Sequence, residues 1–302
     1  MLLTLENSRF RVEADSLGAE LTSIYDKTAD REYLWQGDPA LWPHRAPVLF
    51  PWCGPLAGGD IRKDGKNFPG EPEGFSHSMK HKLVCQDSSL ICFRLESGPE
   101  TRELYPWEFT VKTTYALKEN RISSRFKVVN YSNETMYFRC GFLTALNLPF
   151  IPGTRLEDYV LSMEEPGALT ILERDREGLL TGESRMWEPE RGEIPASEKA
   201  LEEGLLFKEP PTRYLQLTSA ATGEFVRLHL REASWAAART RAVRLAGDRL
   251  LSSLSRVPSK SVKISFGFTA VTLRQNLAPP NSASCRPLFR SCTHWMDHWE
   301  AN

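Results

Sequence analysis

The stretch EFTVKTTYALKENRISSRFKVV, residues 108–129, alternates its side chains with a period of two. Phe109, Val111, Thr113, Tyr115 and Leu117 share one face of the first half, and Ile122, Ser124, Phe126 and Val128 share one face of the second. Because side chains alternate between the two faces of a strand, each half predicts a half-buried β-strand. The short Lys118-Glu119-Asn120 link predicts that the two strands form an antiparallel hairpin.

Short strands separated by turn residues recur through most of the 302-residue chain. They predict an all-β fold, a sandwich or a barrel. Prolines repeatedly interrupt residues 150–210, which we interpret as a long connection crossing the sheets, with no internal domain boundary. We predict one domain over 1–272, with 231–261 atypical. Further strands are predicted at 9–13, 19–25, 81–86, 90–96, 136–141, 213–218, 225–230 and 262–272, with a second hairpin turning at Asp64-Gly65.

The charges of the chain nearly balance: 38 Lys and Arg stand against 39 Asp and Glu, a formal net charge of −1. Such a chain has no global field that would gather nucleic acid or an anionic membrane, so a small neutral ligand fits better. The N-terminus reaches Glu6 and Arg9 before a signal-peptide core can form, and no apolar run approaches the ~18 residues of a membrane span. We expect a soluble, cytoplasmic protein.

Six cysteines are spread irregularly along the chain, which indicates free thiols in a reducing compartment. In the polar tail, Cys285, Cys292, His294 and His298 offer thiolate and imidazole ligands, but their spacing fits none of the usual zinc sites. We therefore predict no metal site, and we interpret residues 273–302 as a poorly ordered C-terminal extension.

Residues 231–256 differ in composition from the rest of the chain. They are rich in arginine and alanine, contain no lysine, and have apolar spacing that could form an amphipathic helix. Since runs of charge are usually solvated faces, we favour a basic helix packed on the sheet over a nucleic-acid or membrane patch.

The segment from Glu32 to Met79 has the composition of loops that build a site on a rigid β scaffold. It combines Trp35, Trp42 and Trp52 with many prolines, two histidines and almost no helical periodicity. Trp42 and Trp52 could offer flat apolar faces to a sugar ring, although tryptophans in a β-sandwich are more often part of the core.

Several motifs in a fixed order are similar to those of the aldose 1-epimerase (mutarotase) family, in particular its LacX-like branch. The residues that carry this resemblance are Gly18-Ala19-Glu20-Leu21, Glu32-Tyr33-Leu34-Trp35-Gln36-Gly37-Asp38-Pro39, Ala46-Pro47-Val48-Leu49-Phe50-Pro51, Asp64-Gly65-Lys66 and Ser265-Phe266-Gly267-Phe268-Thr269-Ala270. The resemblance implies a large antiparallel β-supersandwich.

The resemblance also implies a reaction, the interconversion of the α and β anomers of a free sugar without a cofactor. A base takes the proton of the anomeric hydroxyl while an acid protonates the ring oxygen. In the family a glutamate is the base and a histidine the acid, and a second histidine and an arginine hold the sugar.

The sequence departs from the family at these polar positions. In place of the family's His-Gly-Phe-Ala-Arg, this chain has Glu73-Gly74-Phe75-Ser76-His77. Leu143 stands at the position of the histidine that acts as the catalytic acid in the family. Pro55 replaces an arginine. The expected Ile-Glu-Pro-Trp-like strand, which carries the catalytic glutamate, has no counterpart in 231–261.

The resemblance nevertheless indicates candidate site residues. Glu73 and His77 are the catalytic candidates, as base and acid, and the alternative is that both are solvated loop residues. Candidate sugar-binding residues are Trp52, Arg45, Asn147 and Glu203 (or the adjacent Glu202). His44, His81 and His229 carry no pattern of their own.

Three functions remain open from the sequence: an impaired aldose 1-epimerase acting on a hexose-like sugar, a non-catalytic sugar-binding protein, and a degenerate chain without activity. We hypothesise that 231–261 and the tail after Thr272 reflect a shifted reading frame. If no alternative frame of the coding DNA encodes the missing strand, this hypothesis fails.

Overall fold

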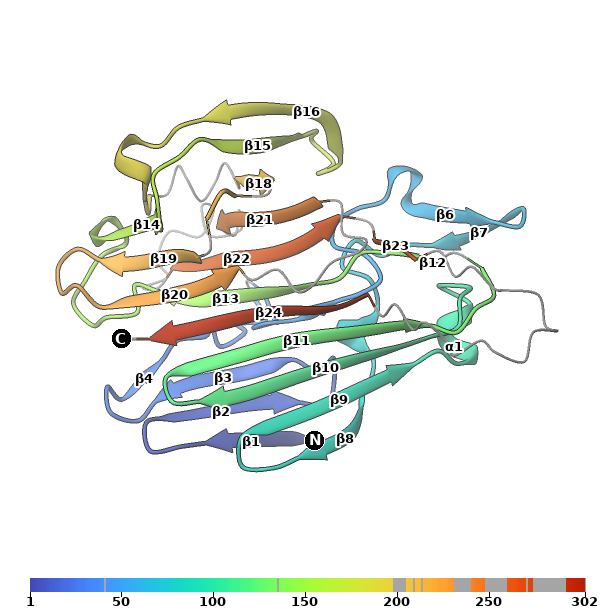
Figure 1. Cartoon of the computed structure of the whole chain (residues 1–302), viewed down its shortest axis with the longest axis horizontal. Coiled ribbons are helices and arrows are strands. Elements are labelled where there is room, and N and C mark those ends of the chain that lie inside the picture. Colours follow the sequence, from blue (N-terminus) through green and yellow to red (C-terminus); the bar gives the residue numbers. More distant parts are fainter. Residues whose placement is uncertain are drawn as a thin grey trace, which may run out of the picture.

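The computed structural model describes residues 1–40, 42–134, 136–197, 205–208, 210–212, 214–230, 240–247, 260–269, 271–273 and 292–301. From residue 240 on, only the backbone is described. Nearly all regular structure in these ranges is β-strand, arranged in three larger sheets and two two-stranded ones (Figure 1). The prediction of an all-β fold is confirmed. The short helices are α1 (Pro99–Arg102), η1 (Ala57–Gly59), η2 (Ser76–Ser78), η3 (Leu156–Asp158) and η4 (Glu190–Gly192).

The N-terminal sheet has four strands in sequence order: β1 (Leu2–Glu6), β2 (Phe10–Asp15), β3 (Leu21–Asp26) and β4 (Arg31–Glu32). Each strand pairs antiparallel with the next. Figure 1 shows this sheet beside β8–β11. The Tyr115 hydroxyl of β10 donates to the Ala19 carbonyl at 2.7 Å, so the loop between β2 and β3 is held against the neighbouring sheet.

The largest sheet has nine strands in the order β17-β14-β19-β20-β24-β11-β10-β9-β8. The predicted hairpin forms its centre, because β10 and β11 pair antiparallel from Phe109↔Asn130 to Lys118↔Arg121. The strands are β8 (Lys82–Gln86), β9 (Leu90–Glu96), β10 (Phe109–Lys118), β11 (Arg121–Asn130), β14 (Tyr159–Met163), β17 (Glu193–Pro195), β19 (Tyr214–Ser219), β20 (Phe225–Leu230) and β24 (Cys292–Ala301).

The third sheet has seven strands in the order β16-β15-β18-β21-β22-β13-β5. They are β5 (Val48–Leu49), β13 (Gly141–Leu148), β15 (Leu169–Arg174), β16 (Leu180–Trp187), β18 (Leu206–Lys208), β21 (Thr240–Gly247) and β22 (Lys260–Thr269). The small sheets pair β6 (Asp60–Lys63) with β7 (Lys66–Pro69), and β12 (Met136–Phe138) with β23 (Val271–Leu273). The second hairpin turns at Asp64-Gly65, as predicted.

Two predictions about irregular segments are wrong. Residues 150–210 are not only a connection, because they contribute β14, β15, β16, β17 and β18 to the two largest sheets. The basic helix is wrong for 240–247, which form β21 between β18 and β22. Residues 292–301 of the predicted extension form β24 between β20 and β11. The division of the chain at residue 272 stays a prediction.

One apolar core joins the sheets, and the alternation in the sequence decides which side chains enter it. Phe109, Val111, Tyr115 and Leu117 of β10 are buried in this core, whereas the side chains of Lys112, Thr114 and Ala116 are only partly buried. Burying an apolar side chain of this size contributes about 1.5–3 kcal/mol to the stability of the fold. Burial of the apolar face of each strand therefore stabilises the packing of the sheets against one another.

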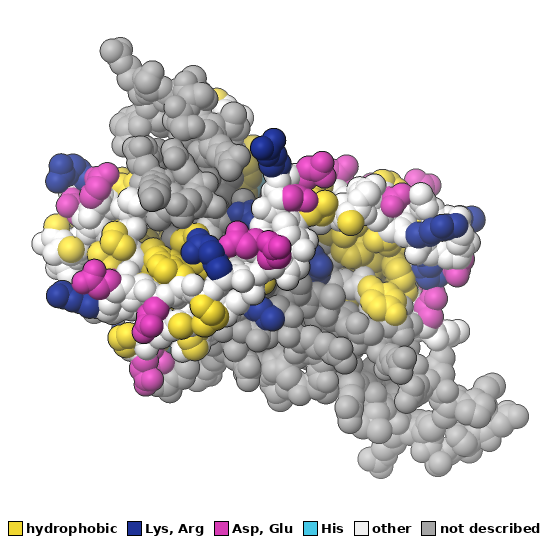
Figure 2. Space-filling model, turned by 90° about the horizontal axis from the view of Figure 1, so that it is seen from above, with side chains coloured by type: hydrophobic (Ala, Val, Ile, Leu, Met, Phe, Trp, Pro, Cys, Tyr) yellow, Lys and Arg dark blue, Asp and Glu magenta, His cyan; other side chains and the backbone are white. Residues whose placement is uncertain are grey.

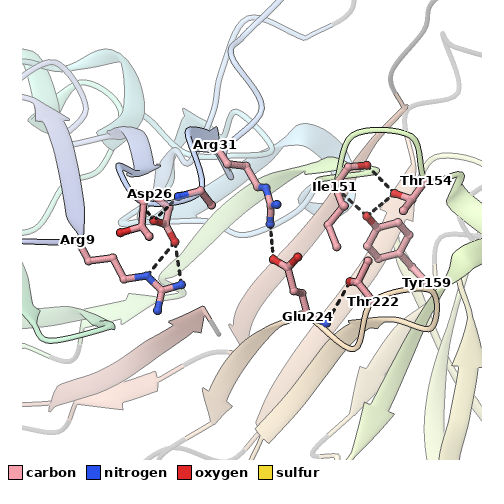
Figure 3. Close-up of polar contacts among 10 residues, drawn as sticks. Arg9, Asp26, Arg31, Ile151, Thr154, Tyr159, Thr222 and Glu224 are labelled. Carbon is pink, nitrogen blue, oxygen red and sulfur yellow. Dashed lines mark hydrogen bonds and ion pairs between the residues drawn. The ribbon is translucent and has the colours of Figure 1, made fainter.

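The turn after β3 is tied to β2 by a buried carboxylate (Figure 3). Asp26 is fully buried, and its Oδ2 accepts hydrogen bonds from Nε and Nη2 of Arg9 at 2.9 and 2.8 Å. Its Oδ1 accepts from the Thr28 and Ala29 N–H groups at 2.9 and 3.1 Å. Figure 3 also shows Arg31 paired with Glu224 of the β19–β20 turn, at 2.7 Å, which links two sheets.

The Asp26→Ala substitution is expected to lower the free energy of unfolding by about 2 kcal/mol, because it removes a fully buried carboxylate that accepts hydrogen bonds from Arg9, Thr28 and Ala29. Urea unfolding measures this change. Glu173→Ala is the control, because Glu173 lies in an exposed ion pair with Arg185 at 2.9 Å, and its loss should cost less than about 1 kcal/mol. Equal losses for the two variants would contradict the role of Asp26.

On the face seen in Figure 2, acidic, basic and apolar side chains of the described residues are interspersed, and the charged ones form no large patch of one sign. None of the helices in the described ranges is long and apolar enough to cross a membrane.

Candidate functional site

The candidate site is built where the segment before β5 runs along the edge of β13. The Asn147 N–H donates to the Tyr33 carbonyl at 2.8 Å, and the Trp35 N–H donates to the Ala145 carbonyl at 3.0 Å. Further along the same edge, Ala145 N–H donates to the Arg45 carbonyl at 2.9 Å. These bonds hold residues 33–47 against a strand of the seven-stranded sheet, so side chains of this loop acquire fixed positions.

Two tryptophans support the loop. Trp35 is only 6% exposed, packs with Ala145, and donates its Nε1–H to the Trp42 carbonyl at 2.9 Å. The half-buried Trp42 ring packs against this pair and against His44, whose ring centroid lies 5.8 Å from that of Trp42. The segment thus presents an aromatic ring beside an imidazole.

Glu20, in the turn before β3, contacts both His44 and the backbone that follows it. Its Oε1 accepts hydrogen bonds from the Arg45 and Ala46 N–H groups at 2.5 and 2.9 Å, and its Oε2 lies 3.6 Å from Nδ1 of His44. Burial alone would raise the pKa of Glu20, but His44 and the two N–H groups together lower it. The carboxylate therefore remains charged beside the imidazole.

His77 is brought to His44 by the loop that ends in η2. The N–H groups of Phe75 and Ser76 donate to the Phe50 carbonyl at 3.0 and 3.1 Å, which fixes the start of this helix. The rings of His44 and His77 meet edge to face, with centroids 5.2 Å apart and planes at 90°. Two imidazoles from segments more than thirty residues apart thus share one contact.

The pKa of His77 is lowered, first by burial and also by His44, while the charges of Glu73, Glu20 and Glu71 act in the opposite direction. His77 is therefore neutral at pH 7. Within the described chain its Nδ1 is buried and has no hydrogen-bond partner. A neutral imidazole can donate one hydrogen bond and accept another, which suits a sugar hydroxyl.

The two predicted catalytic residues lie in the loop that ends in η2, and two of the predicted binding residues, Trp52 and Asn147, make contacts elsewhere. Glu73 and His77 are half-buried, and the charge of Glu73 acts to raise the pKa of His77. Arg45 is half-buried with no partner for its Nε in the described chain. Trp52 is 7% exposed and packs on Tyr105 in the core. Asn147 donates its Nδ2–H to the Glu32 carbonyl at 3.1 Å.

Glu202, Glu203 and most of 231–261 lie outside the described residues. The side chains of Cys292, His294 and His298 are likewise not described, nor is Cys285. In the part of the chain whose side chains are described, no group of three or more His, Cys, Asp or Glu residues could hold a metal ion.

Two positions expected to carry acid and base chemistry hold residues that cannot exchange protons. Leu143 lies in β13, is buried, and by alternation shares a face with Ala145 of the Trp35 cluster. In the seven-stranded sheet, β21 occupies the interval where the glutamate-bearing strand was expected, and its sequence TRAVRLAG has no carboxylate.

Sequence reasoning missed Glu20 and His44 as members of the site. Glu20 stands in the quoted Gly-Ala-Glu-Leu motif, whereas His44 lies between two quoted motifs and belongs to neither. What joins them to His77 is the contact of three loops, which has no local signal in the sequence.

Comparisons with known proteins give a family and a fold. The profile of the family described as "Aldose 1-epimerase" matches residues 1–216. "Protein LacX, chromosomal" of Lactococcus lactis subsp. lactis is 33% identical over 177 residues, which are 57% of this chain and 59% of that protein. The plasmid LacX protein of that organism is 32% identical over the same length. The chain thus matches less than two thirds of the length of these relatives.

Solved structures extend the similarity to the whole chain. A galactose mutarotase related enzyme from Lactobacillus acidophilus has a TM-score of 0.82 and 22% identity, over 100% of this chain and 97% of that one. A galactose mutarotase-like protein from Lactobacillus casei has a TM-score of 0.74 and 20% identity, over 90% of this chain and 100% of that one. At these identities the match shows the fold alone.

Proposed function

Since this chain belongs to the aldose 1-epimerase family, we propose that it binds a hexose-like sugar where His44 and His77 meet, and that its mutarotation is slow. The observation that carries the proposal is the contact of these two rings, with Glu20 against His44 and the charge of Glu73 acting on His77. Imidazoles and carboxylates in one place can take the hydroxyl groups of a neutral sugar.

Binding rests on an aromatic ring and a set of polar groups. Trp42 lies against His44 and is the half-buried tryptophan of this loop, whereas Trp52 leaves little ring surface for a ligand. In this proposal Trp42 covers the apolar face of the sugar, and His44, His77 and Glu73 bind its hydroxyls. Arg45, Asn147 and Glu203 stay as predicted additional contacts.

Slow catalysis follows from the groups that remain. Mutarotation needs a base at the anomeric hydroxyl and an acid at the ring oxygen. We assign Glu73 as the base and His77 as the acid. Because burial lowers the pKa of His77, its protonated form is scarce at pH 7, so the rate should rise as the pH falls below 6.5. A catalytic pair substituted in this way seldom has optimal geometry, which also favours a slow rate.

A calorimetric titration with α-D-glucose and D-galactose tests binding, and polarimetry of the freshly dissolved sugar tests turnover. His77→Gln and Trp42→Ala are each expected to weaken binding about tenfold, through lost hydrogen bonds and lost ring contact. His229→Gln is the matched control, since His229 lies in β20 of another sheet. No heat with either sugar, together with a rate equal to the buffer blank, would refute the proposal.

A second candidate, a carbohydrate-binding protein without catalysis, is favoured by Leu143 and by the absence of a carboxylate in β21. Binding heat with a rate equal to the blank would select it. A third candidate, a degenerate chain without activity, predicts aggregation, and a cooperative thermal melt would count against it. For the first two we propose a cytoplasmic protein whose partner is a single small sugar.

A further inference from the structure

Two free cysteines face each other across the edge hairpin of the nine-stranded sheet. Cys85 of β8 and Cys92 of β9 are direct partners in the register, and neither is in a disulfide. Residues opposite each other in an antiparallel pair have Cα atoms roughly 4.5–5.5 Å apart, inside the roughly 4.4–6.8 Å range of disulfides. The backbone is therefore already placed for a bond between the two sulfur atoms.

The two thiols differ in accessibility. Cys85 is exposed on the edge strand, whereas Cys92 is 8% exposed and its Sγ accepts a hydrogen bond from the Thr114 hydroxyl at 3.4 Å. A dissolved reagent therefore reaches Cys85 first, and Cys92 is shielded from it but lies beside Cys85.

We propose that Cys85 and Cys92 are a site of reversible disulfide formation, oxidised by an anionic small-molecule disulfide such as glutathione disulfide. The Cys85 thiolate attacks one sulfur of the reagent, forms a mixed disulfide and releases one thiol. The Cys92 thiolate then attacks the Cys85 sulfur and releases the second thiol. The protein loses two hydrogens as protons with two electrons, and the reagent is reduced to two thiols.

The preference for an anionic reagent comes from a row of basic residues on the same outer face. Lys82, Arg94, Lys112 and Lys127 lie opposite one another across β8, β9, β10 and β11. Glu96 pairs with Lys82 at 3.4 Å and with Arg94 at 3.2 Å. In the described chain Lys112 and Lys127 have no ion pair, so this row keeps positive charge and attracts anions.

Electrostatic attraction matters here because Cys85 is a modest nucleophile. Its pKa is raised by a slight loss of hydration of the thiol, by Cys92 and by Asp87, and Lys112 acts in the opposite direction. Only a small fraction of the thiol is ionised at pH 7, so the local concentration of the reagent decides which disulfide reacts.

A single tryptic peptide tests the proposal, because cleavage after Lys82 and Arg94 releases residues 83–94 with both cysteines. The folded full chain is incubated with glutathione disulfide, alkylated with iodoacetamide and digested with trypsin. The mass of the peptide is then measured by mass spectrometry. The peptide is expected to lose two hydrogens and to resist alkylation, and dithiothreitol should restore both thiols. A peptide that keeps two alkylatable thiols, or that stops at a glutathione adduct on Cys85, overturns the proposal.

Variants separate the steps. Cys92→Ser should accumulate the mixed disulfide on Cys85, and Cys85→Ser should leave Cys92 unmodified in the folded chain. Lys112→Gln should slow the reaction with glutathione disulfide about two- to threefold and leave the reaction with a neutral aromatic disulfide unchanged. Lys66→Gln on β7 is the matched control. If Lys112→Gln slows both reagents equally, the electrostatic part of the proposal is wrong.

Discussion

The Gly74→Ala substitution is expected to lower the free energy of unfolding by about 4 kcal/mol, the largest effect of any change considered for this chain. Gly74 has a φ of +69°, and a Cβ placed there would lie 2.2 Å from the Phe50 carbonyl oxygen and 2.4 Å from its carbon. Both are backbone atoms that cannot rotate away. The same carbonyl accepts the N–H groups of Phe75 and Ser76, so relieving the clash breaks two hydrogen bonds as well.

Two control glycines separate the causes of this loss. Gly153 has a φ of +81° and nothing within 4 Å of a Cβ, so Gly153→Ala measures the left-handed backbone alone, about 1 kcal/mol. Gly98 has a φ of −151° and nothing within 4 Å, so Gly98→Ala should change little. Denaturant unfolding of the three variants gives the comparison. Similar losses for Gly74→Ala and Gly153→Ala would show that the Phe50 contact costs nothing.

The Gly74→Ala variant also tests the site, because Gly74 precedes η2, which carries His77. Displacing η2 moves His77 from His44, so the proposed sugar binding should be lost under conditions where the variant is still folded. Retained binding in a folded Gly74→Ala variant would mean that the contact of the two rings is not needed.

Acidification is expected to remove about 3 kcal/mol of stability through His81. His81 is 1% exposed, and burial lowers its pKa from 6.5 to about 4, partly offset by its hydrogen bond to Ser76. Its Nε2 lies 3.1 Å from the Ser76 carbonyl oxygen, which can only accept, so Nε2 carries the hydrogen. Nδ1 is buried without a partner in the described chain, and protonating it would bury an unpaired donor.

The direction of the pH dependence follows from this lowered pKa. The unfolded chain takes up a proton near pH 6.5 and the folded chain only near pH 4. The contribution of His81 is complete above pH 6.5 and is lost as the pH falls from 6.5 to about 4. Unfolding midpoints between pH 7 and 5 measure the slope, before most carboxylates titrate.

His81→Gln is the informative variant, because a glutamine can still donate to Ser76 but does not titrate. It should flatten the slope between pH 6.5 and 5, while His77→Gln should leave most of it, since His77 is only half-buried. An unchanged slope in His81→Gln would assign the acid sensitivity to other groups.

Strand placement was predictable wherever one face of a strand meets water. β10 and β11 alternate because one face packs in the core and the other is hydrated, and their register follows from a short turn. The prediction failed for β14–β18, because prolines there were interpreted as breaks although they stand at strand ends or between strands, as Pro195 does at the end of β17. In 240–247 a helical spacing of apolar residues did not decide the structure, since neighbours on both sides supply strand hydrogen bonds.

The family was also visible in the sequence, because motifs such as Ala46–Pro51 keep their order. The substitutions inferred at Leu143 and His77 stay predictions. The candidate site needed the structure. Glu73 and His77 are close in sequence, but His44 has no pattern of its own, and nothing in the motif that contains Glu20 places it beside His44.

By itself, then, the sequence determined the all-β class, the central hairpin and the family, because periodicity and local motifs depend on neighbours along the chain. Only the tertiary structure decided that Trp52 lies in the core, that His44 meets His77, and that Cys85 faces Cys92. Such contacts depend on how loops and strands pack. The residues that a side chain contacts in the fold cannot be inferred from the residues next to it in the sequence.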